Sequence, residues 1–374
     1  MVKELSNLFL DQAIDVTNTL LILDEIQIQP KAITALKYFQ EDLPELAIIG
    51  VGSLLGVSIR QDQVSFPVGK VDRLTLYPMN FEEFLMANPN KNYSELVMNY
   101  SLSEPLPEYL LDNLEAQFRD YLIVGGMPEA VKTWFESHDL NLVHEVHDNL
   151  LFGYENDVSK YAPADQIVNI RDIWRSIPVQ LSQDNNKFIF SRVKDSARAK
   201  TFEAAMGWLV DAGLIYRLHR IENAYAPLAS QAQLNQYKVF MSDVGLLFRR
   251  VKLSMKALME KSQNTRNFRG SLIENFVLNE LLVKGFQPYY WTSGNTAELD
   301  FLVEFNSQVI PIEAKANINT QAKSYRQFIN KYESLVGFKF SLKNIGYNPD
   351  EKTHNNSLPL AFVWRIEEYL SKYF

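Results

Sequence analysis

The sequence predicts an α/β protein built from several domains. The chain has 374 residues, which is more than a single domain of ordinary size contains, because domains average about 150 residues. A composition of 47% hydrophobic and 22% charged residues is typical of a globular protein. A strand–helix–strand pattern near the N-terminus and a hairpin of apolar strands near the C-terminus supply the α/β character.

The net charge and the absence of cysteine exclude several kinds of functional site. The formal charge of -8 argues against a uniformly basic nucleic-acid coat, so any DNA contact needs a local basic patch. The absence of cysteine excludes disulfides, thiolate zinc sites and cysteine nucleophiles. The N-terminus "MVKELSNLFLDQAIDVTN" carries acids where a signal peptide needs an unbroken apolar core, and no apolar run reaches transmembrane length. We therefore expect a cytoplasmic protein with no membrane partner.

The segment "NTLLILDEIQ" contains an apolar run, Leu20 to Leu23, that ends in Asp24 and Glu25. Such a run is typical of a parallel strand buried on both faces, and its acids then lie where open α/β sheets bind ligands. In that layout Asp24 helps to hold the magnesium of a nucleotide and Glu25 orients the attacking water. The structural alternative is a buried strand that runs into an acidic helix start.

A second apolar strand, "ELAIIGVGSLLG", follows a predicted helix from Ala32 to Gln40. Strand, helix and strand in this order favour a βαβ unit. The Gly52-Ser53 pair after the second strand places Ser53 as a polar sensor beside the phosphates of a nucleotide.

The middle of the chain predicts helices. From Tyr93 to Tyr161 the helical pattern breaks only around Gly125-Gly126 and Pro128, and it contains no ligand constellation. The following segment predicts a helix, a short strand at Phe188 to Phe190, two more helices and a strand pair, which is the order of a winged helix. Four cations cluster near its turn and would contact DNA phosphates: Arg192, Lys194, Arg198 and Lys200. A packing module without sequence-specific binding is the alternative.

The stretch "AELDFLVEFNSQVIPIEAKAN" predicts two strands joined by a two-residue turn at Asn306-Ser307. Asp300 then faces Glu313 on one side of the sheet, with Lys315 on the same side. Opposed carboxylates repel each other, and a bound divalent cation would relieve the repulsion. The alternative is a salt-bridged strand end in which Lys315 neutralises both acids.

Several stretches together resemble one known family. "LLILDEIQ", "GVGSLL", "SFPVGKVDRLTLYPMNFEEFL" and "YLIVGGMPEAV" are similar to a prokaryotic family of AAA-type ATPases with a C-terminal domain similar to PD-(D/E)XK nucleases. "ELDFLV…IPIEAK" resembles the nuclease core, and "RGSLIENFVLNELLVKG" resembles the helix upstream of it. The resemblance covers nearly the whole chain.

The resemblance implies a division of the chain and a chemistry. The expected parts are a partial AAA-type P-loop sheet at 1–88, a helical lid at 89–165, a winged helix at 166–225, a restriction-endonuclease-like α/β domain at 226–345 and a C-terminal extension at 346–374. Asp300 and Glu313 would ligate Mg²⁺ with Glu274 nearby, and Lys315 would orient or activate the attacking water. The implied reaction is hydrolysis of a nucleic-acid phosphodiester, and the alternative is an inert DNA-binding or protein-interaction scaffold.

The sequence departs from the family at the nucleotide site. The family has a glycine-rich Walker A loop, whereas the first glycine here is Gly50 and the Gly69-Lys70 pair is followed by Val71. Val51 also stands where the family usually has threonine. Because a backbone without glycine is poorly suited to wrap a polyphosphate, we expect a truncated, inactive ATPase part that does not bind ATP tightly. The open side of a cut sheet leaves a homo-oligomer as one expected outcome.

Overall fold

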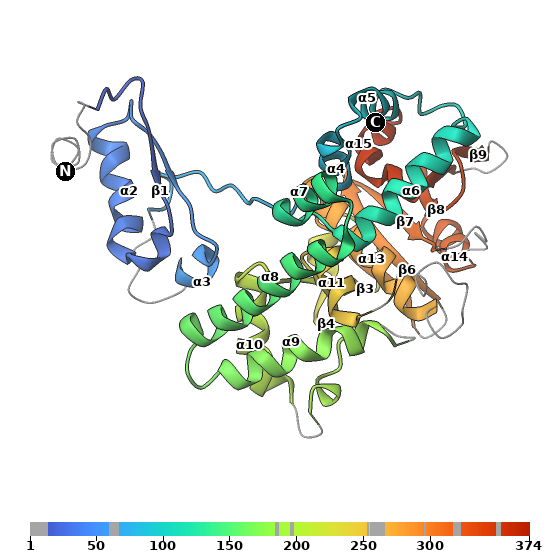
Figure 1. Ribbon diagram of the computed structural model, residues 1–374. Coiled ribbons are helices and arrows are strands. Elements are labelled where there is room, and N and C mark those ends of the chain that lie inside the picture. Colours follow the sequence, from blue (N-terminus) through green and yellow to red (C-terminus); the bar gives the residue numbers. More distant parts are fainter. Residues whose placement is uncertain are drawn as a thin grey trace. The chain divides into compact units, whose positions relative to one another are not determined.

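The computed structural model contains two compact units, Met1–Leu76 with Gly207–Leu214, and Tyr77–Met206 with Ile215–Phe374 (Figure 1). The structure describes residues 14–59, 67–183, 187–194, 198–252, 254, 266–294, 297–316, 323–348 and 353–374.

The first unit contains a parallel strand–helix–strand arrangement. Strand β1 (Leu20–Leu23) pairs in parallel with β2 (Ala47–Gly50). Between them lie the 3₁₀ turn η1 (Ile26–Ile28) and helix α2 (Pro30–Asp42), and helix α3 (Leu55–Ile59) follows β2. Proline suits the first position of α2, because that N–H has no partner inside the helix. This is the βαβ order that the sequence predicts.

Strand β1 differs from its prediction in one respect. An unbroken apolar run predicts burial on both faces, but the side chains of Leu20 and Ile22 are 51% and 57% exposed. On the neighbouring strand Ile49 is 49% exposed, so the same face of β2 is open as well. The prediction is wrong because no side chain in the described part of the chain covers this face.

The second unit begins with helices. Asn80 and Glu83 form a reciprocal capping box at the start of the first of them, which fixes where it begins. A break at Gly125-Gly126 separates two of the helices, as predicted, and Gly125 has a positive φ of 70°. The helices in this region are α4 (Phe81–Ala87), α5 (Lys91–Met98), α6 (Glu108–Val124), α7 (Pro128–Ser137), α8 (Leu140–Tyr161) and α9 (Ile167–Leu181).

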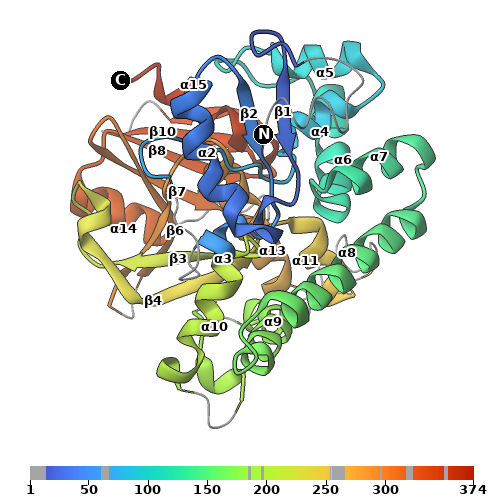
Figure 2. The same ribbon diagram turned by 90° about the vertical axis from the view of Figure 1, so that its left-hand side faces the viewer.

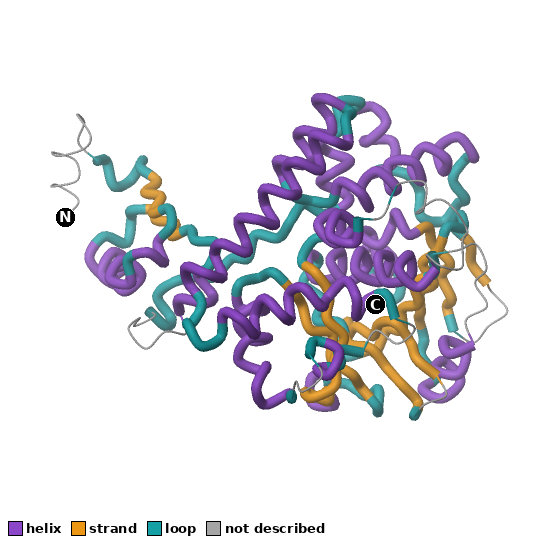
Figure 3. Tube along the Cα trace, turned by 60° about the horizontal axis from the view of Figure 1, so that its bottom comes forward, coloured by secondary structure: helices purple, strands orange, loops and turns teal. Residues whose placement is uncertain are grey.

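Eight strands form one mixed sheet in the second unit, in the order β4-β3-β5-β6-β7-β8-β10-β9 (Figure 2). Their bounds are β3 (Ile215–Ile221), β4 (Ala232–Met241), β5 (Tyr289–Ser293), β6 (Ala297–Phe305), β7 (Gln308–Ala314), β8 (Val336–Ser341), β9 (Gly346–Asn348) and β10 (His354–Pro359). Helices of this unit lie beside the strands in Figure 3. These later helices are α11 (Val244–Val251), α13 (Arg266–Val283), α14 (Lys323–Tyr332) and α15 (Ile366–Leu370), with 3₁₀ turns η3 (Leu228–Gln231) and η5 (Leu360–Arg365).

Among the described residues of 166–225, the structure has one helix fewer than the predicted winged helix. After α9 the described residues show the 3₁₀ turn η2 (Phe190–Arg192) and helix α10 (Ala199–Asp211). In place of the strand predicted at Phe188 to Phe190 there is an isolated bridge between Lys187 and Lys238. The following strands, β3 and β4, are paired with each other and belong to the eight-stranded sheet.

The expected C-terminal extension contains β9 and β10, which belong to the eight-stranded sheet. Strand β10 pairs in parallel with β8 and antiparallel with β9. The polar sequence of β10, "HNNSLP", does not predict a strand inside a sheet, yet Asn355 and Asn356 are buried. The hydroxyl of Tyr325 donates to Asn355 Oδ1 at 2.5 Å, which satisfies the buried amide.

Candidate functional site

The hairpin of β6 and β7 has the register that the sequence predicts. Phe305 pairs with Gln308, and the ladder runs to Phe301 and Ile312. Asn306 and Ser307 have positive φ values of 47° and 62°, as a two-residue turn between twisted strands requires.

Beyond this ladder the carboxylate of Asp300 takes the place of a backbone acceptor. Asp300 Oδ2 accepts a hydrogen bond from the Ala314 amide at 2.8 Å. The ammonium of Lys315 lies 3.9 Å from the same oxygen and also contacts Glu313 Oε1. The structure therefore brings Asp300, Glu313 and Lys315 together at the end of the hairpin.

A lysine that the sequence analysis overlooked lies in the same cluster. Lys238, from the middle of β4, is 1% exposed. Its ammonium lies 3.0 Å from Glu274 Oε2 on α13 and 2.8 Å from Glu298 Oε1 on β6. The signal was available as a single cation inside the apolar run "YKVFM", a position that a lysine occupies only when it has partners. The six groups of this acidic cluster are Lys238, Glu274, Glu298, Asp300, Glu313 and Lys315.

Burial dominates the electrostatics of the carboxylates. It raises the pKa of Glu313 to about 8, with a further rise from the charge of Asp300 that Lys315 partly offsets. Burial also raises the pKa of Glu274, against the attraction of Lys238. Within the described part of the chain, Glu313 Oε2 is buried without a hydrogen-bond partner. A neutral carboxyl is therefore favoured at Glu313 near pH 7 unless a cation binds.

The two lysines are held in their charged form. The charge of Asp300 raises the pKa of Lys315, and Glu313 adds to this effect against the cost of burial. Burial alone would lower the pKa of Lys238, but Glu274 and Glu298 outweigh it, so its pKa lies above the ordinary value. Both ammonium groups remain charged at any physiological pH.

Two carboxylates of the cluster are of the kind that binds divalent cations. Across the described ranges, no three His, Asp or Glu side chains are arranged to hold a metal ion. Asp300 and Glu313 nevertheless offer two carboxylates, one with an unpaired buried oxygen, and Mg²⁺ commonly binds one or two carboxylates and keeps several waters. Glu274, which was expected to complete the set, is instead bound by Lys238.

The predicted nucleotide residues lie together at one edge of the small sheet. Asp24 and Glu25 follow β1, and Ser53 follows its parallel neighbour β2. Asp24 Oδ1 accepts the Glu25 amide at 2.9 Å, and the side chain of Glu25 is bonded by Gln27. All three predicted residues are exposed.

The predicted basic patch is also exposed. Arg192 ends η2, Lys194 and Arg198 lie between η2 and α10, and Lys200 lies in the first turn of α10. All four side chains are accessible to a polyanion.

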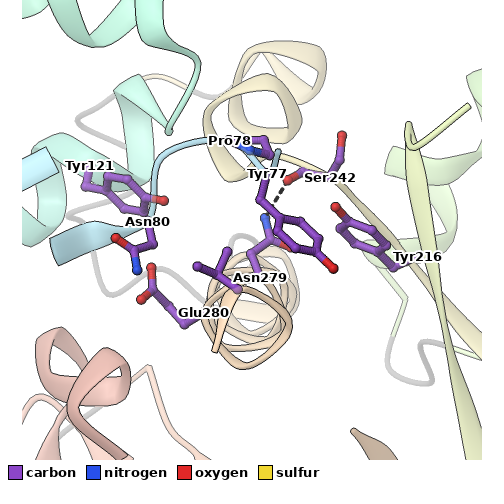
Figure 4. A pocket seen from close by; sticks show the side chains of 9 residues that line it. Tyr77, Pro78, Asn80, Tyr121, Tyr216, Ser242, Asn279 and Glu280 are labelled. Atoms are coloured by element: carbon purple, nitrogen blue, oxygen red, sulfur yellow. Dashed lines mark hydrogen bonds between the residues drawn. The ribbon is translucent and has the colours of Figure 1, made fainter. Parts of the chain in front are cut away.

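A small pocket in the second unit is lined in part by another acid, Glu280 of α13 (Figure 4). Glu280 is 1% exposed, and its Oε1 accepts the amide of Phe81 at 2.8 Å. Burial raises its pKa to about 8. Because Phe81 opens α4, this carboxyl fixes the start of that helix. The other residues that line the pocket include Tyr77, Asn80, Tyr121, Tyr216, Ser242 and Asn279.

Family profiles match three parts of the chain. An AAA domain profile matches residues 2–85, which contain Asp24, Glu25 and Ser53. The match supports an AAA-type ATPase family. Two domains of unknown function, DUF8612 and DUF4143, match residues 115–257 and 269–367 of the chain. Glu274, Glu298, Asp300, Glu313 and Lys315 all lie in the DUF4143 match.

Comparison with solved structures gives a partial likeness. The Walker-type ATPase PABY2304 of Pyrococcus abyssi is 17% identical, with a TM-score of 0.38. The alignment covers 62% of this chain and 62% of that chain, so the match spans about three fifths of the relative. No curated protein matches the chain. Among the described helices, none has the length and apolar character needed to cross a bilayer.

Proposed function

We propose that this AAA-family chain carries a nuclease-like C-terminal domain that hydrolyses nucleic-acid phosphodiesters with Mg²⁺. The observation that supports the proposal most strongly is the convergence of Asp300, Glu313 and Lys315 at the end of the β6–β7 hairpin. Two carboxylates and a lysine at neighbouring strand ends suit phosphodiester hydrolysis, which needs a cation site and a positive group near the scissile phosphate.

Charge balance favours a cation in the acidic cluster. Four carboxylates face two ammonium groups there, so two negative charges are uncompensated if every group is ionised. Protonation of Glu313 removes part of this excess, and a divalent cation would remove all of it. Cation binding would then release the proton from Glu313.

Each residue of the cluster has a distinct role in this proposal. Asp300 and Glu313 would hold Mg²⁺, which would polarise the phosphate and lower the pKa of a bound water. The ammonium of Lys315, which lies beside both carboxylates, would orient the attacking water and stabilise negative charge on the phosphate. Lys238 positions Glu274 and Glu298 around this centre.

The remaining predicted residues enter as contacts outside the reaction centre. A winged-helix role for the segment around α10 would bring Arg192, Lys194, Arg198 and Lys200 onto DNA phosphates. Asp24, Glu25 and Ser53 form the Walker B and sensor half of a nucleotide site.

A cleavage assay tests the nuclease proposal. End-labelled single- and double-stranded DNA is incubated with the purified chain in Mg²⁺ or Mn²⁺. We expect cleavage by the wild type and a loss of about 100-fold or more in Asp300→Asn, since the substitution removes a metal ligand. Glu367→Gln, which removes an exposed acid of α15, is the matched control and should cleave normally. Equal cleavage by wild type and Asp300→Asn contradicts the proposal.

An inert DNA-binding scaffold is the second candidate, and the exposed cations around α10 favour it. It predicts a DNA complex without cleavage whose affinity falls steeply as salt rises. A gel-shift series between low and moderate salt measures this dependence, with Arg198→Gln/Lys200→Gln as the weakened variant. A DNA affinity that changes neither with salt nor with the substitutions contradicts this candidate.

A further inference from the structure

We infer that the ammonium of Lys238 permanently fills one cation position of the acidic cluster, so that the cluster accepts a single divalent cation. The inference rests on the proposed function for the identity of the cation. It assigns Lys238 as a positioning residue, because its ammonium touches two acids of the cluster and not the hairpin pair Asp300 and Glu313.

The contacts of Lys238 are those of a bridging cation. Its ammonium joins carboxylates from two different elements, Glu274 on α13 at 3.0 Å and Glu298 on β6 at 2.8 Å. The ring of Tyr290 lies 5.2 Å from the same nitrogen, which adds a cation–π contact. Acidic sites that hold two metal ions bridge them with carboxylates in a comparable way, but here one bridging charge belongs to the chain.

The backbone keeps this ammonium in place. Lys238 lies inside β4, where it pairs with Leu218 of β3 and forms a bridge with Lys187. Its side chain is 1% exposed, so the ammonium is shielded from water in the folded chain. A competing cation must therefore displace a buried charge, at a cost in free energy.

Lys315 provides the contrast within the same cluster. Its side chain is 35% exposed and follows the end of β7, so its ammonium can move into water when a cation approaches. One lysine is thus exchangeable and the other is fixed. The exchangeable lysine covers Asp300 and Glu313, which makes this pair the single entry point for a divalent cation.

Manganese titration of the full chain tests the inference. Isothermal titration calorimetry, with electron paramagnetic resonance of free Mn²⁺ as a second readout, is applied to wild type, Lys238→Met and Lys238→Arg. We expect one Mn²⁺ per wild-type chain and two per Lys238→Met chain, because the substitution removes the ammonium that lies between Glu274 and Glu298. Lys238→Arg keeps the charge and should bind one. A folded Lys238→Met chain that binds Mn²⁺ with wild-type stoichiometry and affinity overturns the inference.

Folding of the variant supplies the second measurement. If Lys238→Met is unfolded in EDTA by circular dichroism, the inference expects Mn²⁺ to restore its helical signal and a cooperative melting transition. No recovery with Mn²⁺ overturns it. The proposed function fails separately, if wild type binds no Mn²⁺, and in that case binding gained by Lys238→Met still supports the cation position of Lys238.

Discussion

Acids lie at or near strand ends in both units of this chain, and the two groups differ in burial. Asp24 and Glu25 follow β1 and are exposed, so water solvates their charges. Glu313 at the end of β7 is 3% exposed, and Asp300 and Glu274 are largely covered as well. Asp24 and Glu25 have no charged partner among their described contacts, whereas the acids of the second unit contact two lysines.

This difference shows which acidic motifs carry structural information. An exposed carboxylate costs almost nothing, so its presence at a strand end is compatible with many roles. A buried carboxylate destabilises the fold unless a cation, a hydrogen bond or protonation compensates it. The acidic cluster of the second unit therefore carries a cost in folding free energy that its two lysines offset.

The largest effect is expected from removing the fixed counter-charge. Lys238→Met removes the shared ammonium from Glu274, which is 15% exposed, and from Glu298, which is 36% exposed, so we expect a loss of about 3 kcal/mol in the free energy of unfolding in EDTA. Urea denaturation measures it, with Lys187→Met as a control because that side chain is not buried. A loss below about 1 kcal/mol would mean that the acidic cluster needs its counter-charge no more than the exposed acids Asp24 and Glu25 do.

Removing the exchangeable lysine should separate binding from chemistry. We expect Lys315→Met to cleave DNA about 100-fold more slowly, because the attacking water loses its orienting charge. Mn²⁺ affinity should be kept or improved, since the competing ammonium is gone from Asp300 and Glu313. Parallel cleavage and calorimetric assays with Lys315→Arg as control distinguish this result from general damage, which would lower both quantities.

Glu280 extends the comparison to a buried acid outside the cluster. Its pKa of about 8 exceeds the ordinary 4.5, so between these values the folded state holds a proton that the unfolded state has lost. Stability should therefore fall as pH rises from about 5 to 8 and then level off. Glu280→Gln keeps an acceptor for the Phe81 amide without the charge, so it should exceed wild type by on the order of 2 kcal/mol at pH 9 and match it near pH 5.

Chemical denaturation at a series of pH values checks this expectation. Glu367→Gln is again the matched control, because that acid is exposed and should show no such trend. An unchanged difference between Glu280→Gln and wild type across pH 5 to 9 would show that Glu280 is ionised in the folded chain.

The smallest effect is expected at the exposed acids of the first unit. Asp24→Asn and Glu25→Gln should each change the free energy of unfolding by no more than about 0.5 kcal/mol. Thermal denaturation of both variants measures the change. A loss well above 1 kcal/mol would mean that the two strand ends do not differ in the way that their burial indicates.

The hairpin could be predicted because local rules determine it. Alternating apolar residues and the Asn306-Ser307 turn fix the register, and the register alone brings Asp300 towards Glu313. The role of Lys238 could not be predicted in this way, since its partners come from α13 and β6, 36 and 60 positions away. Contacts of this kind depend on the packing of a helix against a sheet, which no sequence period specifies.

The difference between local rules and contacts with distant segments also explains the errors in the fold prediction. Strand β10 was hidden because Asn355 and Asn356 resemble a loop until Tyr325 and the backbone of β8 satisfy them. Strand β1 was expected to be covered on both faces because its sequence gives its apolar character but not its neighbours.

Calorimetric titration of the wild-type chain and Glu313→Gln with Mn²⁺ at pH 7 tests the cation site most directly. A cation site at Asp300 and Glu313 predicts one ion per wild-type chain, release of a proton on binding, and loss of that binding in Glu313→Gln. No binding to the folded wild type, or unchanged binding by Glu313→Gln, would show that Lys315 neutralises the two acids for structural reasons alone.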